Sequence, residues 1–256
     1  MSLQIDIVRA CYRKKVALEN IHFSLCDGTL TAVIGRNGSG KSTLVSCLAS
    51  LIPFEGNVTS AQQSLASLSH RDRARHVSCL LQEPAHPRMT VEELVACGRN
   101  PHRSLLEPLS QADLAAIEDA LRAADLVSLR DRAADRLSGG ELRRAYFGAI
   151  LAQNAPNVLL DEATAFMDTD YEHRFLRMAQ SLAHDRSRAV LCVLHDLSSA
   201  LAYADRILLL NGGNQLFFGT VPALLSTTLI EQVFHVRRVT ADSRVFFVPL
   251  EDEKGF

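Results

Sequence analysis

The sequence has no tryptophan, only four lysines among its 256 residues, and no apolar stretch long enough to span a bilayer. A membrane-spanning helix needs roughly 18 consecutive apolar residues. Residues 1–6 also lack the basic and apolar regions of a signal peptide. We therefore expect a chain whose membrane role, if it has one, comes through a partner.

Cysteine is present but is not paired in any metal-binding or disulfide pattern. The six cysteines are scattered without a C-x-x-C pair. Several lie in apolar runs, where free cysteine behaves as a small hydrophobic residue. This pattern argues against a zinc site or a disulfide framework and favours a reducing cytosol. The formal net charge of −2 gives no support for a nucleic-acid partner.

Because lysine is rare, the lysine at position 41 stands out. It lies in G-R-N-G-S-G-K-S-T, which matches the phosphate-loop pattern G-x-x-x-x-G-K-[ST] at every fixed position. A strand-like run precedes the loop and a helix-like run follows it, so backbone N–H groups and a helix N-terminus face one anion. The alternative is a Gly/Ser turn before an ordinary helix. The order strand, loop, helix favours a nucleoside triphosphate, bound by Gly35, Arg36, Asn37, Gly38, Ser39, Gly40, Lys41, Ser42 and Thr43.

The first ninety residues read mostly as strands. Residues 3–8 alternate apolar and polar side chains, and residues 21–25 continue the pattern. Asp27-Gly28 predicts a tight hairpin into residues 29–34. From residue 90 apolar side chains recur at helical spacing, with a helix start at Ser110. We expect a helical subdomain, residues 83–155, inserted into an α/β core of residues 1–82 and 156–256.

Strands return as near-continuous apolar runs at residues 158–160, 190–194 and 207–210. Such runs are typical of parallel strands covered on both faces by helices. The turn signal at residues 211–214 then leads into an antiparallel strand.

Four of the predicted strands end next to residues suited to a nucleotide site. They lead into the phosphate loop, Gln82, Asp161-Glu162 and His195. Ligands of open α/β sheets bind at the carboxyl ends of the strands, so adjacent parallel strands would gather these groups. Asp161 is then the expected Mg²⁺ ligand and Glu162 a candidate general base. Each residue alone has a plainer interpretation, as a solvated turn, a packed histidine or a strand-end glutamine.

Residues 137–141, L-S-G-G-E, form a further motif. Ser138 and Glu141 make a capping box before a helix over residues 142–151, and a well-capped helix is the plain interpretation. However, each glycine inside a helix lowers helix stability by about 1 kcal/mol relative to alanine. Gly139 and Gly140 are explained if the backbone must approach an anion closely at the helix N-terminus.

Together these motifs resemble the ATPase subunits of ATP-binding cassette (ABC) transporters over nearly the full chain. The resemblance implies a P-loop NTPase fold of ABC ATPase type, with a mixed-sheet core, an inserted helical subdomain and an N-terminal antiparallel β subdomain. It also implies ATP and Mg²⁺ as cofactors and ATP hydrolysis coupled to transport. The site roles that it implies are as follows: Lys41, Glu162 and His195 in catalysis; Ser42, Gln82 and Asp161 at the metal; Ser138, Gly139, Gly140 and Glu141 as the signature; Asp168 in the D-loop.

At four residues the match to the family is less firm. Tyr12 matches the aromatic residue that stacks on adenine, although an exposed strand-end tyrosine is an equal alternative. Ala163 stands where the family commonly has proline, and Phe166-Met167 precedes the D-loop aspartate where leucine is usual. Neither departure removes a catalytic group.

Finer features resemble the importers for iron–siderophore complexes, heme and vitamin B12. These are residues 97–102, C-G-R-N-P-H, and residues 229–236, a helix-to-strand passage. The resemblance implies a homodimer in which each signature closes over the other chain's ATP. It further implies permease subunits contacted through the region after Gln82, a substrate-binding protein, no nucleic acid, and a peripheral location on the cytoplasmic side of the inner membrane.

Two other functions remain possible at the level of sequence. One is a soluble ABC ATPase outside transport; those carry a fused second cassette or a long coiled-coil insertion, and Lys41 and Ser138 lie too close for that insertion. The other is a small-molecule kinase, against which the signature argues. The transported substrate, and import rather than export, rest on resemblance alone.

Overall fold

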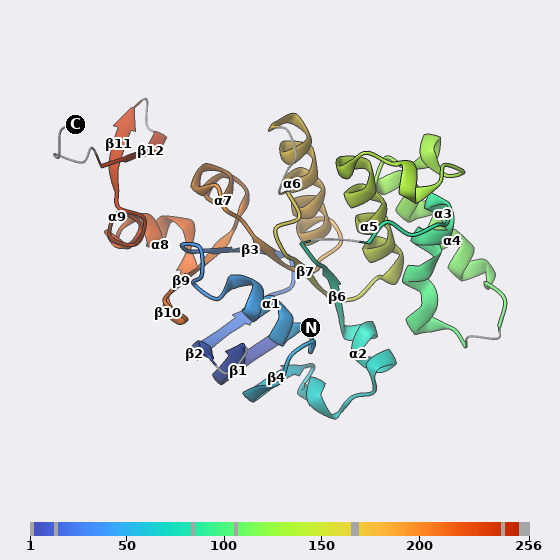
Figure 1. Cartoon of the computed structure of the whole chain (residues 1–256), viewed down its shortest axis with the longest axis horizontal. Helices are drawn as coiled ribbons and strands as arrows, with labels where there is room; N and C mark the ends of the chain where they lie inside the picture. Colours follow the sequence, from blue (N-terminus) through green and yellow to red (C-terminus); the bar gives the residue numbers. More distant parts are fainter. Residues whose placement is uncertain are drawn as a thin grey trace.

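The computed structural model describes residues 3–12, 15–82, 85–104, 107–164, 169–241 and 244–250. Within these residues one mixed sheet has the strand order β5-β4-β1-β2-β10-β9-β3-β8-β7-β6 (Figure 1), and a separate pair is formed by β11 and β12. The strands are β1 Leu3–Tyr12, β2 Lys15–Leu25, β3 Thr29–Ile34, β4 Phe54–Ser60, β5 Gln63–Ser64, β6 Val77–Leu80, β7 Asn157–Leu160, β8 Ala189–Val193, β9 Arg206–Asn211, β10 Asn214–Thr220, β11 Val236–Ala241 and β12 Arg244–Pro249.

Helices connect and cover these strands. The α-helices are α1 Lys41–Leu48, α2 His70–His76, α3 Val91–Ala96, α4 Gln111–Ala123, α5 Gly139–Gln153, α6 Thr169–His184, α7 Leu197–Tyr203, α8 Val221–Leu225 and α9 Leu229–Phe234. Short 3₁₀ turns are η1 Leu65–Ser67, η2 Cys97–His102, η3 Val127–Leu129 and η4 Ala134–Arg136.

The strands predicted to hold the polar residues are adjacent and parallel. β3 pairs in parallel with β8 and β9, and β7 pairs in parallel with β8 and β6. β10 returns antiparallel to β9 after the turn at residues 211–214, as the sequence predicted. The carboxyl ends of β3, β8, β7 and β6 therefore lie at one edge of the sheet.

The N-terminal strands form the antiparallel part of the same sheet. β1 pairs with β2 and β4, and β2 joins these strands to β10 through one register pair, Glu19 with Asn214. The predicted hairpin at Asp27-Gly28 is wrong. Gly28 does make a turn with φ of 73°, but its N–H donates to the Arg188 carbonyl, and β3 inserts between β8 and β9 instead of pairing with β2. The apolar character on both faces of β3 explains this central position.

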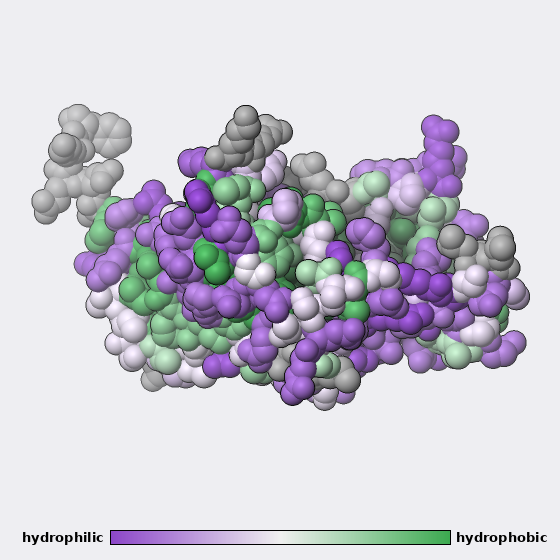
Figure 2. All heavy atoms as spheres, turned by 90° about the horizontal axis from the view of Figure 1, so that it is seen from below, coloured by the Kyte–Doolittle hydropathy of each residue, from purple (hydrophilic) through white to green (hydrophobic). Residues whose placement is uncertain are grey.

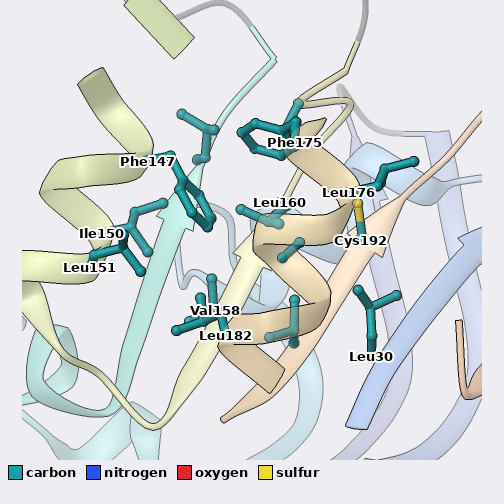
Figure 3. Close-up of a cluster of buried hydrophobic side chains, with 14 of the residues drawn as sticks. Leu30, Phe147, Ile150, Leu151, Val158, Leu160, Phe175, Leu176, Leu182 and Cys192 are labelled. Carbon is teal, nitrogen blue, oxygen red and sulfur yellow. The ribbon is translucent and has the colours of Figure 1, made fainter. Parts of the chain in front are cut away.

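Apolar side chains cover both faces of the parallel strands, as their continuous hydrophobic runs predicted. Along β8, Val190 and Cys192 pack toward α5 and α6, whereas Leu191 and Val193 pack toward α1 and the antiparallel strands. Figure 3 shows the first of these layers, with α5 and α6 laid across the sheet. The rings of Phe147 and Phe175 meet there, with centroids 5.0 Å apart.

Helices α3, α4 and α5 begin at matched side-chain caps. Thr90, Ser110 and Ser138 each accept a hydrogen bond from the backbone N–H three residues on, and the acidic side chain at that position bonds back to the N-cap. Each reciprocal pair satisfies two donors that a helix end leaves free. The predicted start at Ser110 is confirmed. Helix α5, however, begins at Gly139, earlier than the expected residue 142.

The segment Cys97–His102 fastens this helical region together. The Arg99 side chain donates to the Asp113 carboxylate at 2.8 Å and to the Ala152 carbonyl at 2.7 Å. A Cβ atom at Gly98 would lie 2.1 Å from the Ala149 carbonyl oxygen, so only glycine lets the segment pack against α5. The Pro101 carbonyl accepts hydrogen bonds from two arginines of α2.

The surface seen from below is largely hydrophilic, with apolar residues mostly in the left half of the view (Figure 2). Across the described ranges no helix is both long enough and apolar enough to cross a membrane.

The Arg99–Asp113 contact predicts a measurable, pH-dependent share of stability. The Asp113 carboxylate accepts hydrogen bonds from Ser110 and Arg99, and these bonds lower the pKa of Asp113 to about 2. A carboxyl group whose pKa is lowered in the folded state stabilises that state at pH values above its ordinary pKa of 3.8. This stabilisation is lost as the pH falls toward 2. We expect Asp113→Asn to reduce the free energy of unfolding by about 2 kcal/mol at pH 7, with a smaller difference at pH 3, measured by urea denaturation.

The matched control is Asp119→Asn on the same helix. Asp119 is 69% exposed and its contact with Arg122 is 3.8 Å long, so we expect an effect below about 0.5 kcal/mol. Equal effects of the two variants at pH 7 would contradict a special role for Asp113.

Candidate nucleotide-binding site

The phosphate loop runs from the end of β3 into α1, and its backbone geometry depends on glycine. Gly38 and Gly40 have φ of 78° and 100°, values that L-residues with a Cβ rarely adopt. A Cβ atom at Gly40 would lie 2.5 Å from Leu18 Cδ2 and 2.8 Å from the Ala17 carbonyl oxygen. The loop therefore packs too closely against β2 for any other residue at position 40.

Lys41 is buried in the loop that it follows. Its Nζ donates to the Gly35 carbonyl at 2.9 Å and to the Arg36 carbonyl at 3.2 Å. Burial lowers the pKa of Lys41, while the negative charges of Glu162 and Asp161 oppose this. The ammonium group thus lies inside the loop and close to two carboxylates.

The turn at residues 211–214 supports the loop from the other side, which the sequence analysis did not foresee. The Gly213 N–H donates to the Ser39 carbonyl at 3.2 Å, and the Glu19 N–H donates to the Gly213 carbonyl at 2.9 Å. Gly213 has φ of 85°, and a Cβ there would lie 2.7 Å from the Ala17 carbonyl oxygen. No separate sequence signal marked this role, because Gly212 and Gly213 both have positive φ and the turn alone explains the Gly-Gly pair.

Asp161 follows β7 and faces the start of α1. The Ser42 hydroxyl donates to Asp161 Oδ1 at 3.3 Å, and Asp161 is only 4% exposed. Burial raises the pKa of Asp161 to about 6; the hydrogen bond from Ser42 opposes this rise and the charge of Glu162 adds to it. A hydroxyl and a carboxylate at this spacing are ligands suited to a hard divalent cation.

Glu162 is held by residues that follow the two neighbouring strands. Gln82 Nε2 donates to Glu162 Oε2, and His195 Nε2 lies 2.6 Å from Glu162 Oε1. The Glu162 side chain is 12% exposed and the His195 side chain 47% exposed. Glu162 also has φ of 47°, an unfavourable conformation for a residue with a side chain. The bend turns its carboxylate from β7 toward the loop.

These groups line one cavity of about 710 Å³, a volume within the range of small-molecule sites. Among the other residues of the loop, Gly35 and Ser39 are buried and Arg36 is exposed. The predicted site residues that line the cavity are Tyr12, Asn37, Gly38, Gly40, Lys41, Ser42, Thr43, Gln82, Glu162 and His195.

The residues present fit a magnesium nucleotide. The Ser39 hydroxyl is buried and, within the described residues, has no hydrogen-bond partner in the protein. Ser39 does not line the cavity, but Gly40 and Lys41 do, and a Cβ atom at Gly40 would meet β2, so the cradle beside the Lys41 ammonium group requires glycine. Ser42 and Asp161 supply oxygen ligands next to the cradle, whereas the amide nitrogen of Gln82 is directed to Glu162.

The family model described as "ABC transporter" matches residues 18–165. The chain belongs to the ABC transporter family. Similar relatives include the ferric enterobactin transport ATP-binding protein FepC of Escherichia coli, 34% identical over 93% of this chain and 89% of that protein. The hemin import ATP-binding protein HmuV of Shewanella denitrificans is 35% identical over 91% and 93%.

Solved structures agree on the fold. A chain described as belonging to a metal-chelate type ABC transporter in an inward-facing conformation matches with a TM-score of 0.82 and 24% identity, covering 97% of both chains. The ATP-binding cassette MJ1267 in its ADP conformation matches with a TM-score of 0.79 and 22% identity, covering 92% of this chain and 99% of that one. The ABC ATPase fold expected from the motifs is therefore confirmed.

The residues matching the ABC transporter signature do not line the cavity of their own chain. Ser138 and Gly139 are exposed at the N-terminus of α5, and a Cβ at Gly139 or Gly140 would meet no atom within 4 Å. The Ser138 N–H donates to Glu141 at 2.8 Å, which helps to lower the pKa of the Glu141 carboxyl. Asp168, assigned to the D-loop, lies outside the described residues.

One residue next to this site was missed by the sequence analysis. Arg143 on α5 is 7% exposed and bonds to backbone carbonyls beside the cavity. A signal was available, because Arg143, Phe147 and Ile150 recur at the spacing of a buried helix face. A charged residue on such a face indicates a specific partner.

The packing at Gly40 predicts a test of the cradle. We expect Gly40→Ala to weaken MgATP binding at least tenfold, because the added methyl group must displace β2 or distort the loop. Equilibrium titration with a fluorescent ATP analogue measures the Kd.

Gly28→Ala is the matched control. Gly28 has φ of 73° but open space around it, so this variant carries similar backbone strain away from the cavity. Its Kd should equal that of the unmodified chain, and an equal loss in both variants would contradict the account of Gly40.

Proposed function

We propose that this chain hydrolyses ATP to power import through an ABC transporter, with a metal chelate as the cargo. The main support is the meeting of Gln82, Glu162 and His195 over one phosphate cradle. The relatives named for ferric enterobactin, hemin and iron(3+)-hydroxamate support the cargo class, since each matches over most of both chains. A soluble ABC ATPase outside transport remains the second candidate.

In this proposal the side chains of the cavity divide the work. Lys41 and the loop amides bind the outer phosphates, and Ser42 and Asp161 would hold Mg²⁺. When bound, Mg²⁺ would neutralise charge on the phosphate oxygens. Glu162 accepts a proton from the attacking water, and Gln82 and His195 keep its carboxylate in place. Their contacts with both Glu162 oxygens support these positioning roles.

We further propose a homodimer with two shared sites. The exposure of Ser138 and Gly139 and the open space above both signature glycines support this, because another molecule can approach them closely. In a twofold dimer each signature would cover the partner's nucleotide. The helical region, residues 83–155, would move relative to residues 1–82 and 156–256 as the dimer closes.

The remaining partners are permease subunits and a substrate-binding protein. We propose that the permease binds the region after Gln82, which places the chain on the cytoplasmic side of the inner membrane. A groove of about 430 Å³ is lined by residues that precede Gln82, among them the exposed apolar Leu51 and Leu81, and it would extend this contact surface. Identification of the membrane protein that copurifies from the native host tests this assignment.

We expect Glu162→Gln to bind MgATP with unchanged affinity and to hydrolyse it at least about 100-fold more slowly, because the general base is removed. Phosphate release measures turnover. The control is Glu172→Gln on α6, where Glu172 contacts Ser199 and does not line the cavity; its turnover should be normal. Normal hydrolysis by Glu162→Gln would rule out Glu162 as the base.

The shared sites predict a second result. In the Glu162→Gln background, MgATP should produce a dimer in light scattering, and adding Ser138→Arg should return it to monomers with ATP still bound. Ser110→Arg removes an equivalent helix cap on α4 and should leave the dimer intact. Dimers that persist with Ser138→Arg would mean that the signature does not cover the partner's nucleotide.

A further inference from the structure

A buried arginine on the signature helix contacts the two segments that carry Gln82 and Glu162. Arg143 lies on α5, five residues after the N-cap Ser138, and is 7% exposed. Its Nη1 donates to the Glu162 carbonyl at 2.8 Å, and its Nη2 donates to the Gln82 carbonyl at 3.0 Å. One side chain thus joins three segments that are far apart in the sequence.

Both acceptors lie where the sheet ladder has ended. β6 and β7 pair as far as Leu80 and Leu160, and the Asp161 N–H still donates to the Leu80 carbonyl. Beyond this point the chain turns away, and Glu162 adopts φ of 47°. Backbone carbonyls in a partly buried position need donors. Arg143 supplies them where a further residue of sheet pairing would have done so.

The guanidinium group is chemically suited to this task. It is planar and has several N–H donors in fixed directions, so it can bond two carbonyls at once, whereas a lysine ammonium lacks this fork. Burial lowers the pKa of Arg143 and the negative charge of Glu162 opposes this. Arginine nevertheless stays protonated in proteins, so the bridge is permanent over the working pH range.

A second donor on the same helix holds the same segment. The Tyr146 hydroxyl donates to the Ala85 carbonyl at 2.7 Å. Arg143 and Tyr146 are three residues apart and therefore share a helix face. The face continues into Phe147 and Ile150, which pack against the sheet (Figure 3). Helix α5 is therefore packed on the sheet and is also hydrogen-bonded to residues 82 and 85.

We propose that Arg143 is a positioning residue that couples the signature helix to Gln82 and Glu162 of its own chain. This inference rests on the proposed ATPase function. Arg143 does not line the cavity, so it acts through the two carbonyls that it holds. Because α5 also carries the exposed Ser138, a movement of α5 against the partner's nucleotide would shift the base at the chain's own nucleotide.

The test is Arg143→Lys, with Arg188→Lys as the matched control. Arg188 is a partly buried arginine that donates to Asn154 at the other end of α5, away from the cavity. We expect Arg143→Lys to reduce kcat at least tenfold with the Kd for MgATP changed less than twofold. Arg188→Lys should change neither more than twofold. Unchanged kcat in Arg143→Lys would overturn the proposal.

A measurement independent of hydrolysis separates this inference from the proposed function. Since the chain has no tryptophan, Ala85→Trp gives a single reporter on an exposed position of the segment after Gln82. Acrylamide quenching of this tryptophan should rise at least twofold in Arg143→Lys and stay unchanged in Arg188→Lys. Equal quenching in all variants would overturn the positioning role, even if the protein proves to be an active ATPase.

If Arg143→Lys does not fold, Tyr146→Phe tests the same coupling. It removes only the hydroxyl that bonds to Ala85. With Ala85 kept and the reporter placed by Leu81→Trp, an exposed position, quenching should rise while the melting temperature stays within a few degrees. Unchanged quenching in this variant would count against coupling through α5. If the unmodified chain does not hydrolyse ATP but its Arg143 variant still shows raised quenching, the ATPase proposal is rejected and the positioning role is kept.

Discussion

The candidate site depends on the parallel pairing of β8, β7 and β6. His195 follows β8, Glu162 follows β7 and Gln82 follows β6, and β7 lies between the other two. The central strand therefore delivers the carboxylate, and each neighbour delivers one side chain that contacts it. The roles of Gln82 and His195 would change if the strand order changed, even with every residue retained.

Buried charge is the second constraint on this edge of the sheet. Lys41, Asp161 and Arg143 are each no more than 7% exposed, and all three have partners in the protein. Buried charges are costly unless they are paired and hydrogen-bonded. Lys41 and Arg143 are bonded to backbone carbonyls and Asp161 to the Ser42 hydroxyl, so each buried charge depends on the local backbone or side chain that partners it. The raised pKa of Asp161, to about 6, is the clearest sign of this burial.

The sequence predicted which segments form helices and strands better than it predicted which strands pair with one another. The phosphate-loop glycines, the cap at Ser110 and the apolar parallel strands follow from local patterns, and the structure has these features. The hairpin at Asp27-Gly28 was wrong because its turn residues do not specify which strand pairs with β3.

The same reason explains what was missed at the site. The support of the loop by Gly213 and the bridge made by Arg143 both join segments that are distant in the sequence. Such contacts depend on strand order and on the packing of α5, which local periodicity does not determine. The match of residues 97–102 to importer sequences gave no warning that Arg99 is a structural anchor between α4 and α5.

The position of β3 has a consequence for the order of biosynthesis. This strand carries the phosphate loop, but both of its partners, β8 and β9, come from the last third of the chain. A ribosome must therefore translate beyond residue 211 before the strand ahead of the loop can be enclosed. Until then the nascent chain exposes an apolar segment of the kind that chaperones retain. Nucleotide can thus be captured only after β9 has been made, long after the phosphate loop itself has been translated.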